Sequence, residues 1–196
     1  MFAKDYRQAA WKKLSGKWGN AILAVLVAGL ITGGLSATGV GAIIVSGPLA
    51  LGLACFFLAV SRSSDPKLET IFSGFNLSFV SSLLAQILIA IFTFLWSLLF
   101  IIPGIIKAIS YSMTFYVIAD NPEMSATEAV KESRKIMHGN KWRFFCLQFS
   151  FIGWILLSVL TCGILMLWIA PYMQAANAEF YESIKPQAVQ AETPAV

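Results

Sequence analysis

Charged residues divide the chain into three long apolar runs. Residues 18–61, 70–106 and 144–178 contain no Lys, Arg, Asp or Glu. Each run is long enough for two membrane-spanning helices, since one crossing takes about 20 apolar residues. Small or helix-breaking residues interrupt the first and third runs near their middle, at 36–39 and 161–163, and the second run near its end, at 103–104. The pattern predicts an all-α polytopic transmembrane helical bundle whose six spans, near 19–35, 40–60, 79–101, 103–119, 144–160 and 164–180, form three hairpins.

The remaining charges predict how these hairpins are oriented. Nearly all of them lie outside the apolar runs, and the basic residues ahead of the first run are Lys4, Arg7, Lys12, Lys13 and Lys17. Basic residues close to membrane ends stay in the cytoplasm. We therefore expect both termini on the cytoplasmic side and three uncharged hairpin tips on the outer side. Lys107 is the exception, because it lies four residues inside the fourth span, near the predicted outer face.

Composition supports a membrane protein. Hydrophobic residues make up 58% of the 196 residues and charged residues only 12%, whereas soluble proteins are roughly one quarter charged. The net charge is +4, but the basic residues flank the spans and do not form a stripe with free aromatic side chains. This argues against nucleic acid as a partner. It fits contact with membrane lipids, in particular an anionic inner leaflet.

The three hairpins have similar glycine and proline residues at the ends of their predicted spans. A glycine precedes each hairpin, and each returning span begins near one proline and ends before another. We expect a single transmembrane domain over 1–186, divided into three repeats at 1–66, 67–122 and 123–186. The alternative is that all membrane hairpins need such residues, because proline fits a helix start and stops a helix end. Residues 187–196 lack periodicity and are predicted to form a disordered C-terminal tail.

Amphipathic helices are expected on the cytoplasmic side between the hairpins. In the clearest one, at 125–138, Ser125 and Glu128 form a capping-box pattern. Its apolar stripe, with Ser133 as the polar interruption, consists of Ala126, Ala129, Val130, Ile136 and Met137. A similar stripe at the N-terminus consists of Phe2, Tyr6, Ala9, Ala10 and Leu14. Such a helix lies in the plane of the membrane interface or packs on the cytoplasmic ends of the bundle, and the sequence leaves both open.

Four polar residues within the spans are candidate ligand or lipid contacts. Lys107 either extends its amine to lipid headgroups or provides a cation in a cavity, with Tyr111 on the same helix face four residues on. Gln86 and Gln148 lie inside other spans, where they fasten neighbouring helices or contact a substrate.

Small and aromatic residues give two further expectations. Glycines at 29, 33, 34, 47 and 52 are expected to let the first two helices approach closely. Trp18 and Trp142 are placed near the inner headgroups and Trp96 and Trp168 near the outer ones, as in an aromatic belt. Trp154 is assigned to packing within a span.

No catalytic constellation is found in the sequence. His138 is the only histidine, and no Cys, Asp or Glu stands at metal-ligand spacing from it. No Ser/His/Asp set and no glycine-rich phosphate loop is present. We therefore expect a protein that is not an enzyme and has no metal or cofactor.

Several ordered stretches carry a family resemblance. They are residues 102–107, Tyr111, 116–122, Ser125 with Glu128 and Ala129, 150–154, 167–172 and 179–181. Together they resemble the bacterial integral membrane family catalogued as domain of unknown function 975, from Arg7 to Tyr181. The resemblance implies a multi-span protein of the bacterial cytoplasmic membrane and implies no reaction, ligand or catalytic residue.

The leading functional hypothesis is a non-enzymatic membrane protein accessory to transport, export or envelope homeostasis. It would act through a membrane-protein partner or a lipid-like amphiphile. One alternative is a small transporter or channel whose own bundle holds a polar path lined by Gln86, Lys107, Tyr111 and Gln148. A lipid-modifying membrane enzyme is the other alternative.

Overall fold

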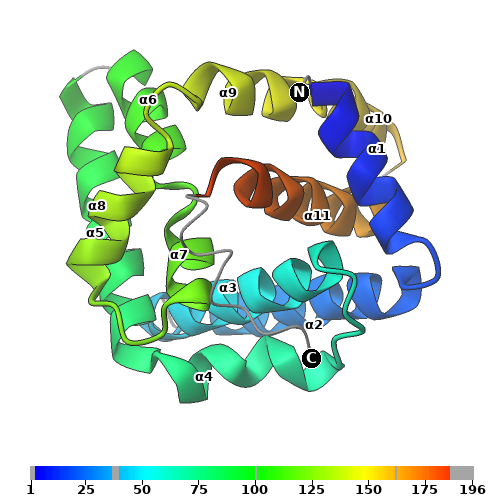
Figure 1. Ribbon diagram of the computed structural model, residues 1–196, viewed down its shortest axis with the longest axis horizontal. Helices are drawn as coiled ribbons and strands as arrows, with labels where there is room; N and C mark the ends of the chain where they lie inside the picture. The colour runs from blue at the N-terminus through cyan, green and yellow to red at the C-terminus, as the bar shows by residue number, and fades with distance from the viewer. Residues whose placement is uncertain (1–2, 37–39, 100, 162, 186–196) are drawn as a thin grey trace.

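The described chain is built from α-helices and one short 3₁₀ helix. The computed structural model describes residues 3–36, 40–99, 101–161 and 163–185, so the predicted tail at 187–196 and parts of the predicted hairpin tips lie outside the described residues. Within those ranges there is no β-strand. The elements shown in Figure 1 are α1 (Ala3–Leu14), α2 (Trp18–Ser36), α3 (Val40–Ser61), η1 (Leu68–Phe72), α4 (Ser73–Leu77), α5 (Phe79–Leu99), α6 (Ile101–Tyr111), α7 (Thr114–Asp120), α8 (Ala126–Ile136), α9 (Lys141–Phe149), α10 (Ile152–Leu160) and α11 (Met166–Ile184).

Four segments of the described chain are long and apolar enough to cross a membrane. They are Trp18–Leu35, Ile44–Ser61, Phe79–Trp96 and Lys141–Leu160. The six predicted spans are therefore not confirmed. The predicted fourth span is divided at Ser112 and Met113 into α6 and α7, and α11 includes the polar residues Gln174, Asn177 and Glu179.

Helix α3 lies at the centre of the packing. It contacts α2, α5, α7, α11 and the short helices η1 and α4, and its second half buries Phe56, Phe57 and Val60 completely or nearly so. At Gly52 the backbone of η1 comes so close that a Cβ atom would stand 1.6 Å from the carbonyl oxygen of Ile71. Glycine is required there because only its missing side chain permits this approach.

The predicted role of the glycines in joining the first two helices is wrong. Gly47 and Gly52 approach Ser82 of α5 and Ile71 of η1, not α2. Among the described residues, a Cβ built at Gly29 or at either of the glycines 33 and 34 would meet no atom within 4 Å outside its own stretch of helix. The described part of the chain therefore shows no close helix contact at the glycines of α2.

Helix α8 begins with the predicted capping box. The Ser125 hydroxyl accepts from the amide of Glu128, and the Glu128 carboxylate accepts from the amide of Ser125. The buried face of α8 packs against α5, α6 and α7, and the buried Ser133 hydroxyl donates to the carbonyl of Ser110 at 2.9 Å. Helix α8 therefore packs against other helices, and its predicted position in the membrane interface or at the cytoplasmic ends of the bundle stays a prediction.

Helix α1 is packed in the same way. Its residues Tyr6, Ala10 and Leu14 are buried, and the helix lies against α11. Phe2, the first member of the predicted stripe, lies outside the described residues.

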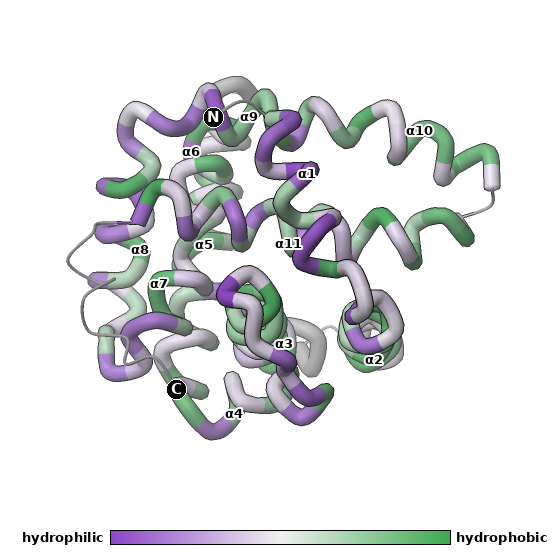
Figure 2. Tube along the Cα trace, turned by 45° about the vertical axis from the view of Figure 1, so that its right-hand side comes forward, coloured by the Kyte–Doolittle hydropathy of each residue, from purple (hydrophilic) through white to green (hydrophobic). Residues whose placement is uncertain are grey.

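The protein-buried core and the exposed apolar surface lie in different parts of the molecule. Helix α10 and the first part of α11 project together from the body, while the same view looks along the axes of α2 and α3 (Figure 2). At the projecting end Val159 and Leu160 are 73% and 83% exposed, and Leu98 near the end of α5 is 77% exposed. Exposed apolar surface on this scale requires a covering of lipid or protein.

Charged residues join the ends of three helices. Arg62 follows α3, Asp120 ends α7, and Glu182 and Lys185 stand at the end of α11. The Asp120 carboxylate binds Arg62 at 2.5 Å, and Glu182 binds both Arg62 at 2.9 Å and Lys185 at 2.7 Å. We call these four residues the charged cluster.

Candidate functional site

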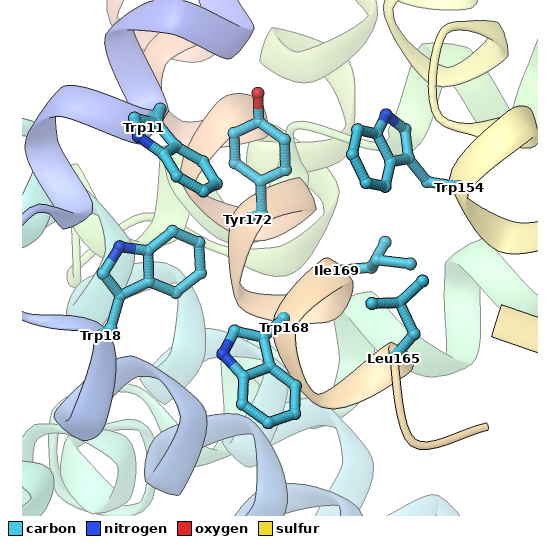
Figure 3. Close-up of a pocket in the computed structure, with 7 residues that line it drawn as sticks. All are labelled: Trp11, Trp18, Trp154, Leu165, Trp168, Ile169 and Tyr172. Carbon is cyan, nitrogen blue, oxygen red and sulfur yellow. The ribbon is translucent and has the colours of Figure 1, made fainter. Parts of the chain in front are cut away.

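An apolar cavity of about 500 Å³ lies between the α1–α2 segment and the α10–α11 hairpin (Figure 3). We call it the aromatic cavity, because four of the six tryptophans line it. Its lining residues are Trp11, Trp18, Trp154, Leu165, Trp168, Ile169 and Tyr172. The volume is in the range of pockets that hold small ligands, about 300 to 1,000 Å³.

Local helix geometry places most of this wall. Leu165, Trp168 and Tyr172 follow one another at intervals of three or four residues, which puts them on one face of α11. On the other side, α1 ends in a turn at Gly16, whose φ of +82° is favourable for glycine. That turn leads into α2 and lets the rings of Trp11 and Trp18 meet at 5.0 Å between centroids.

Tyr172 connects the two sides of the aromatic cavity. Its ring meets Trp11 edge to face at 5.7 Å, and its hydroxyl donates to the carbonyl oxygen of Arg7 at 3.0 Å. On its far side Phe151 packs edge to face at 5.3 Å, and the Arg7 guanidinium carbon lies 5.7 Å from the centre of the Phe151 ring. The aromatic wall is therefore held by packing and by a backbone hydrogen bond.

The predicted aromatic belt is wrong for two tryptophans. Trp18 and Trp168 were expected at opposite faces of the membrane, but both line the aromatic cavity. A cavity of this size cannot extend across a hydrocarbon core of about 30 Å. Trp154, assigned to packing, also faces the cavity.

The sequence analysis predicted none of the residues that line the aromatic cavity as site residues, and Trp11 and Tyr172 were given no role at all. The signal available for them was the regular aromatic spacing in α11 and the interval of seven residues between Trp11 and Trp18. Neither interval shows that the N-terminal helix and the last hairpin are neighbours.

A second cavity, of about 510 Å³, is basic. It is lined by Lys107, Ser110, Lys131, Arg134, Lys135, His138 and Lys141, and we call it the basic cavity. The predicted position of Lys107 near the outer face, away from the charged segments, is therefore not what the structure shows. Helix α8 runs back along the α5–α6 hairpin, so its basic residues reach the level of Lys107. The Lys107 amine also lies over the ring of Trp96, at 4.6 Å from its centre.

The other three predicted residues lie elsewhere. Tyr111 is buried against Phe92, with ring centres 6.2 Å apart. Gln86 is half-buried in α5. Gln148 donates to the side-chain oxygen of Asn177 at 2.7 Å, which joins α9 to α11.

A third, smaller cavity is lined partly by polar side chains. It measures about 230 Å³ and is lined in part by Ser112, Tyr116, Gln174 and Asn177. The Tyr116 hydroxyl donates to Gln174 at 3.3 Å. None of the four predicted residues lines this cavity, but Gln148 donates a hydrogen bond to Asn177, which does.

The charged cluster is a structural rather than an accessible site. The side chains of Asp120 and Lys185 are each 4% exposed. Burial alone would lower the pKa of Arg62, but the hydrogen bond and charge of Asp120 outweigh it and raise that pKa above its usual value. Every charge in the cluster is thus paired. Among the described ranges of the chain, no three His, Cys, Asp or Glu side chains are placed to hold a metal ion.

Comparison with known proteins connects the chain to one family. No curated protein and no solved structure matches it. The family described as "Protein of unknown function (DUF975)" matches residues 1–110 and 100–188, which together cover nearly the whole sequence. The chain therefore belongs to the DUF975 family, to which no activity is assigned.

Proposed function

We propose that this protein is a non-enzymatic membrane protein that assists transport, export or envelope homeostasis by binding the apolar part of a lipid-like amphiphile. The aromatic cavity is the observation that carries the proposal. Its size suits a small ligand, and its wall consists of indole, phenol and aliphatic side chains. Burying apolar surface against such a wall is favourable, by about 25 cal/mol per Å² removed from water.

Access to the aromatic cavity supports an amphiphile as its ligand. Trp11, Trp154 and Trp168 are each about half exposed, whereas Ile169 behind them is buried. A ligand can therefore enter between α1 and α10 without unfolding the core. A carboxylate or a phosphate would be placed badly against this wall, because none of its lining residues carries a positive charge. The acyl or isoprenoid portion of a ligand would therefore occupy the cavity and its polar end would stay outside.

A brominated fatty acid tests the proposal directly, because bromine quenches tryptophan fluorescence on contact. Purified protein in detergent would be titrated with the brominated acid and with its unbrominated parent. We expect saturable quenching for the wild type, since four of the six tryptophans line the aromatic cavity. Trp168→Ala removes part of the wall and should weaken binding at least tenfold.

Trp142→Ala is the matched control. Trp142 is 72% exposed and lies outside the aromatic cavity, so its removal should lower the fluorescence and leave the midpoint of the titration unchanged. Quenching that is non-saturable, or that is equally weakened by both substitutions, would contradict the proposal.

We propose further that the protein is a multi-pass protein of the bacterial cytoplasmic membrane with both termini in the cytoplasm. The basic N-terminal segment supports this topology. The two cavities bring Lys107 of the second hairpin to basic residues of α8, and Leu165 and Trp168 of the third hairpin to α1, so the first hairpin is the one expected to reach the outer side. Single cysteines introduced by Leu35→Cys, Leu98→Cys and Thr161→Cys in a cysteine-free background test this, with Lys12→Cys as the cytoplasmic control. An impermeant maleimide applied to intact cells should label the cysteine at position 35 only. Labelling of Lys12→Cys in intact cells would contradict a cytoplasmic N-terminus.

A small transporter is the second candidate, and the polar cavity next to α3 is the observation that favours it. Gln174 and Asn177 line that cavity, and Gln148 binds Asn177. Flux of amphiphiles and small polar solutes into proteoliposomes, measured for the wild type and Asn177→Ala, separates the two functions. Flux that the substitution abolishes would favour the transporter, whereas amphiphile binding without flux favours the accessory role.

A further inference from the structure

The basic cavity gathers cations from three separate helical segments. Lys107 comes from α6, Lys131, Arg134 and Lys135 from α8, and Lys141 from the start of α9, with His138 between the last two elements. Lys135 of this group forms an ion pair with Glu132, at 3.4 Å between the amine nitrogen and a carboxylate oxygen, and this pair lies on the exposed side of α8. The charge lining the cavity is thus strongly positive.

The fold holds these cations together despite their mutual repulsion. Ser133 binds Ser110 and so fixes α8 against α6, while the buried side chains of Ile136 and Met137 anchor the end of α8. Like charges that line one cavity repel each other. An anion in the cavity would remove that repulsion, which makes an anion the natural ligand.

The surroundings of the basic cavity indicate what carries the anion. The apolar ends of α5 and α6 adjoin it, and Ile105 and Ile106 immediately before Lys107 are both about half exposed. Phe94 and Leu98 on α5 are exposed as well. Basic side chains next to exposed apolar surface match the border between lipid headgroups and acyl chains.

We propose that the basic cavity binds the phosphate group of an anionic phospholipid headgroup, with the acyl chains lying along the apolar ends of α5 and α6. Arg134 presents a planar guanidinium that can hold two phosphate oxygens at once, and the lysines add compact positive charges. The volume of about 510 Å³ exceeds what a bare phosphate needs and leaves room for the rest of a headgroup. The aromatic cavity shares no lining residue with this site, so the inference stands independently of the proposed function.

Native mass spectrometry of the purified protein in detergent tests the site. Phosphatidic acid, phosphatidylglycerol and phosphatidylcholine would be titrated separately against the wild type and the Lys107→Gln/Arg134→Gln double variant. The matched control is Lys4→Gln/Lys12→Gln, which removes the same charge from two exposed positions on α1. We expect the double variant to bind the two anionic lipids about thirtyfold more weakly, since each basic residue contributes about 1 kcal/mol. The control should bind as the wild type does.

Competition by inorganic phosphate and a charge-conserving variant complete the test. Inorganic phosphate at millimolar concentration should displace phosphatidic acid from the wild type only partly. If free phosphate binds as tightly as the lipid does, the acyl chains contribute nothing and the lipid assignment is overturned. Lys107→Arg/Arg134→Lys, which keeps both charges, should retain most of the binding, and an unchanged circular dichroism spectrum of the Lys107→Gln/Arg134→Gln variant shows that this variant is folded.

Equal binding of anionic lipid by the wild type and the double variant would overturn the proposal, and so would an equal loss in the control. Trp168→Ala should leave anionic headgroup binding unchanged. A failure of the aromatic cavity and a failure of the basic cavity would therefore be told apart.

Discussion

Asp120 is the polar residue whose substitution we expect to destabilise the protein most. Its carboxylate accepts from Arg62 at 2.5 Å and from the Tyr181 hydroxyl at 3.1 Å, and lies 3.9 Å from the Lys185 amine. Only 4% of the side chain is exposed. These contacts join α7 to the ends of α3 and α11, so the substitution acts on three helices at once.

The expected magnitude follows from which charges remain. After Asp120→Ala, Glu182 is the remaining ion-pair partner of both Arg62 and Lys185. The side chain of Lys185 is 4% exposed, so water cannot replace the lost carboxylate there. Removing one partner from a buried pair costs about 3 to 5 kcal/mol. Arg62 is 32% exposed, so water compensates part of the loss. We therefore expect about 3 kcal/mol for Asp120→Ala and about 1.5 to 2 kcal/mol for Arg62→Ala, because Asp120 would keep its other two partners.

Reversible unfolding in detergent micelles, followed by circular dichroism, measures these values. Together with the double variant, the two substitutions form a cycle whose coupling energy should reach about 1 to 2 kcal/mol. Lys135→Ala is the control, since its pair with Glu132 is exposed and should contribute less than about 0.5 kcal/mol. An Asp120→Ala effect as small as that of the control would refute the claim that the charged cluster is buried and cooperative.

Two other predictions follow from close contacts. Gly52→Ala should destabilise the fold by about 2 kcal/mol or more, because the new methyl group would overlap the Ile71 carbonyl and move η1. Gly29→Ala, with no atom near it, should stabilise α2 by about 0.5 to 1 kcal/mol, and a loss of stability at both positions would contradict this reasoning. Burial, the charge of Asp120 and their hydrogen bond raise the pKa of Tyr181 above its usual value of 10.0. The stability it contributes is therefore present below pH 10 and falls at higher pH, so thermal unfolding should show the wild type losing stability relative to Tyr181→Phe above pH 10, with parallel curves as the contrary result.

Features that depend on residues close in the chain could be predicted from the sequence. The capping box at Ser125 and Glu128 is an example, because the two partners lie on one helical turn. The apolar runs likewise predicted helical, membrane-compatible segments, although only four segments of the described chain reach the length and hydropathy of a span. Helix breaks within the return segments, such as that before Thr114, were not visible in an uncharged run.

The candidate sites were only partly predictable. Lys107 was identified by its position within an apolar segment, but its cationic neighbours lie 24 or more residues further on and reach it because α8 folds back along its own hairpin. The aromatic cavity was missed, since Trp11 and Trp168 belong to opposite ends of the chain. A topology drawn from hydropathy assigns levels within a membrane and does not state which hairpins touch.

By itself the sequence determined the helical class, the restriction of charge to the segments around the apolar runs, and the local signals at helix ends, because these arise from residue chemistry and from spacing within one helix. The tertiary structure alone decided that α3 occupies the centre, that Gly52 meets η1 rather than α2, and that distant aromatic and basic residues form two separate cavities. The physical reason is that apolar helices resemble one another in sequence, so the sequence hardly distinguishes which two of them pack together. Their choice of neighbour depends on shape at a few small residues and on a few polar contacts, such as those of Ser133 and Asp120.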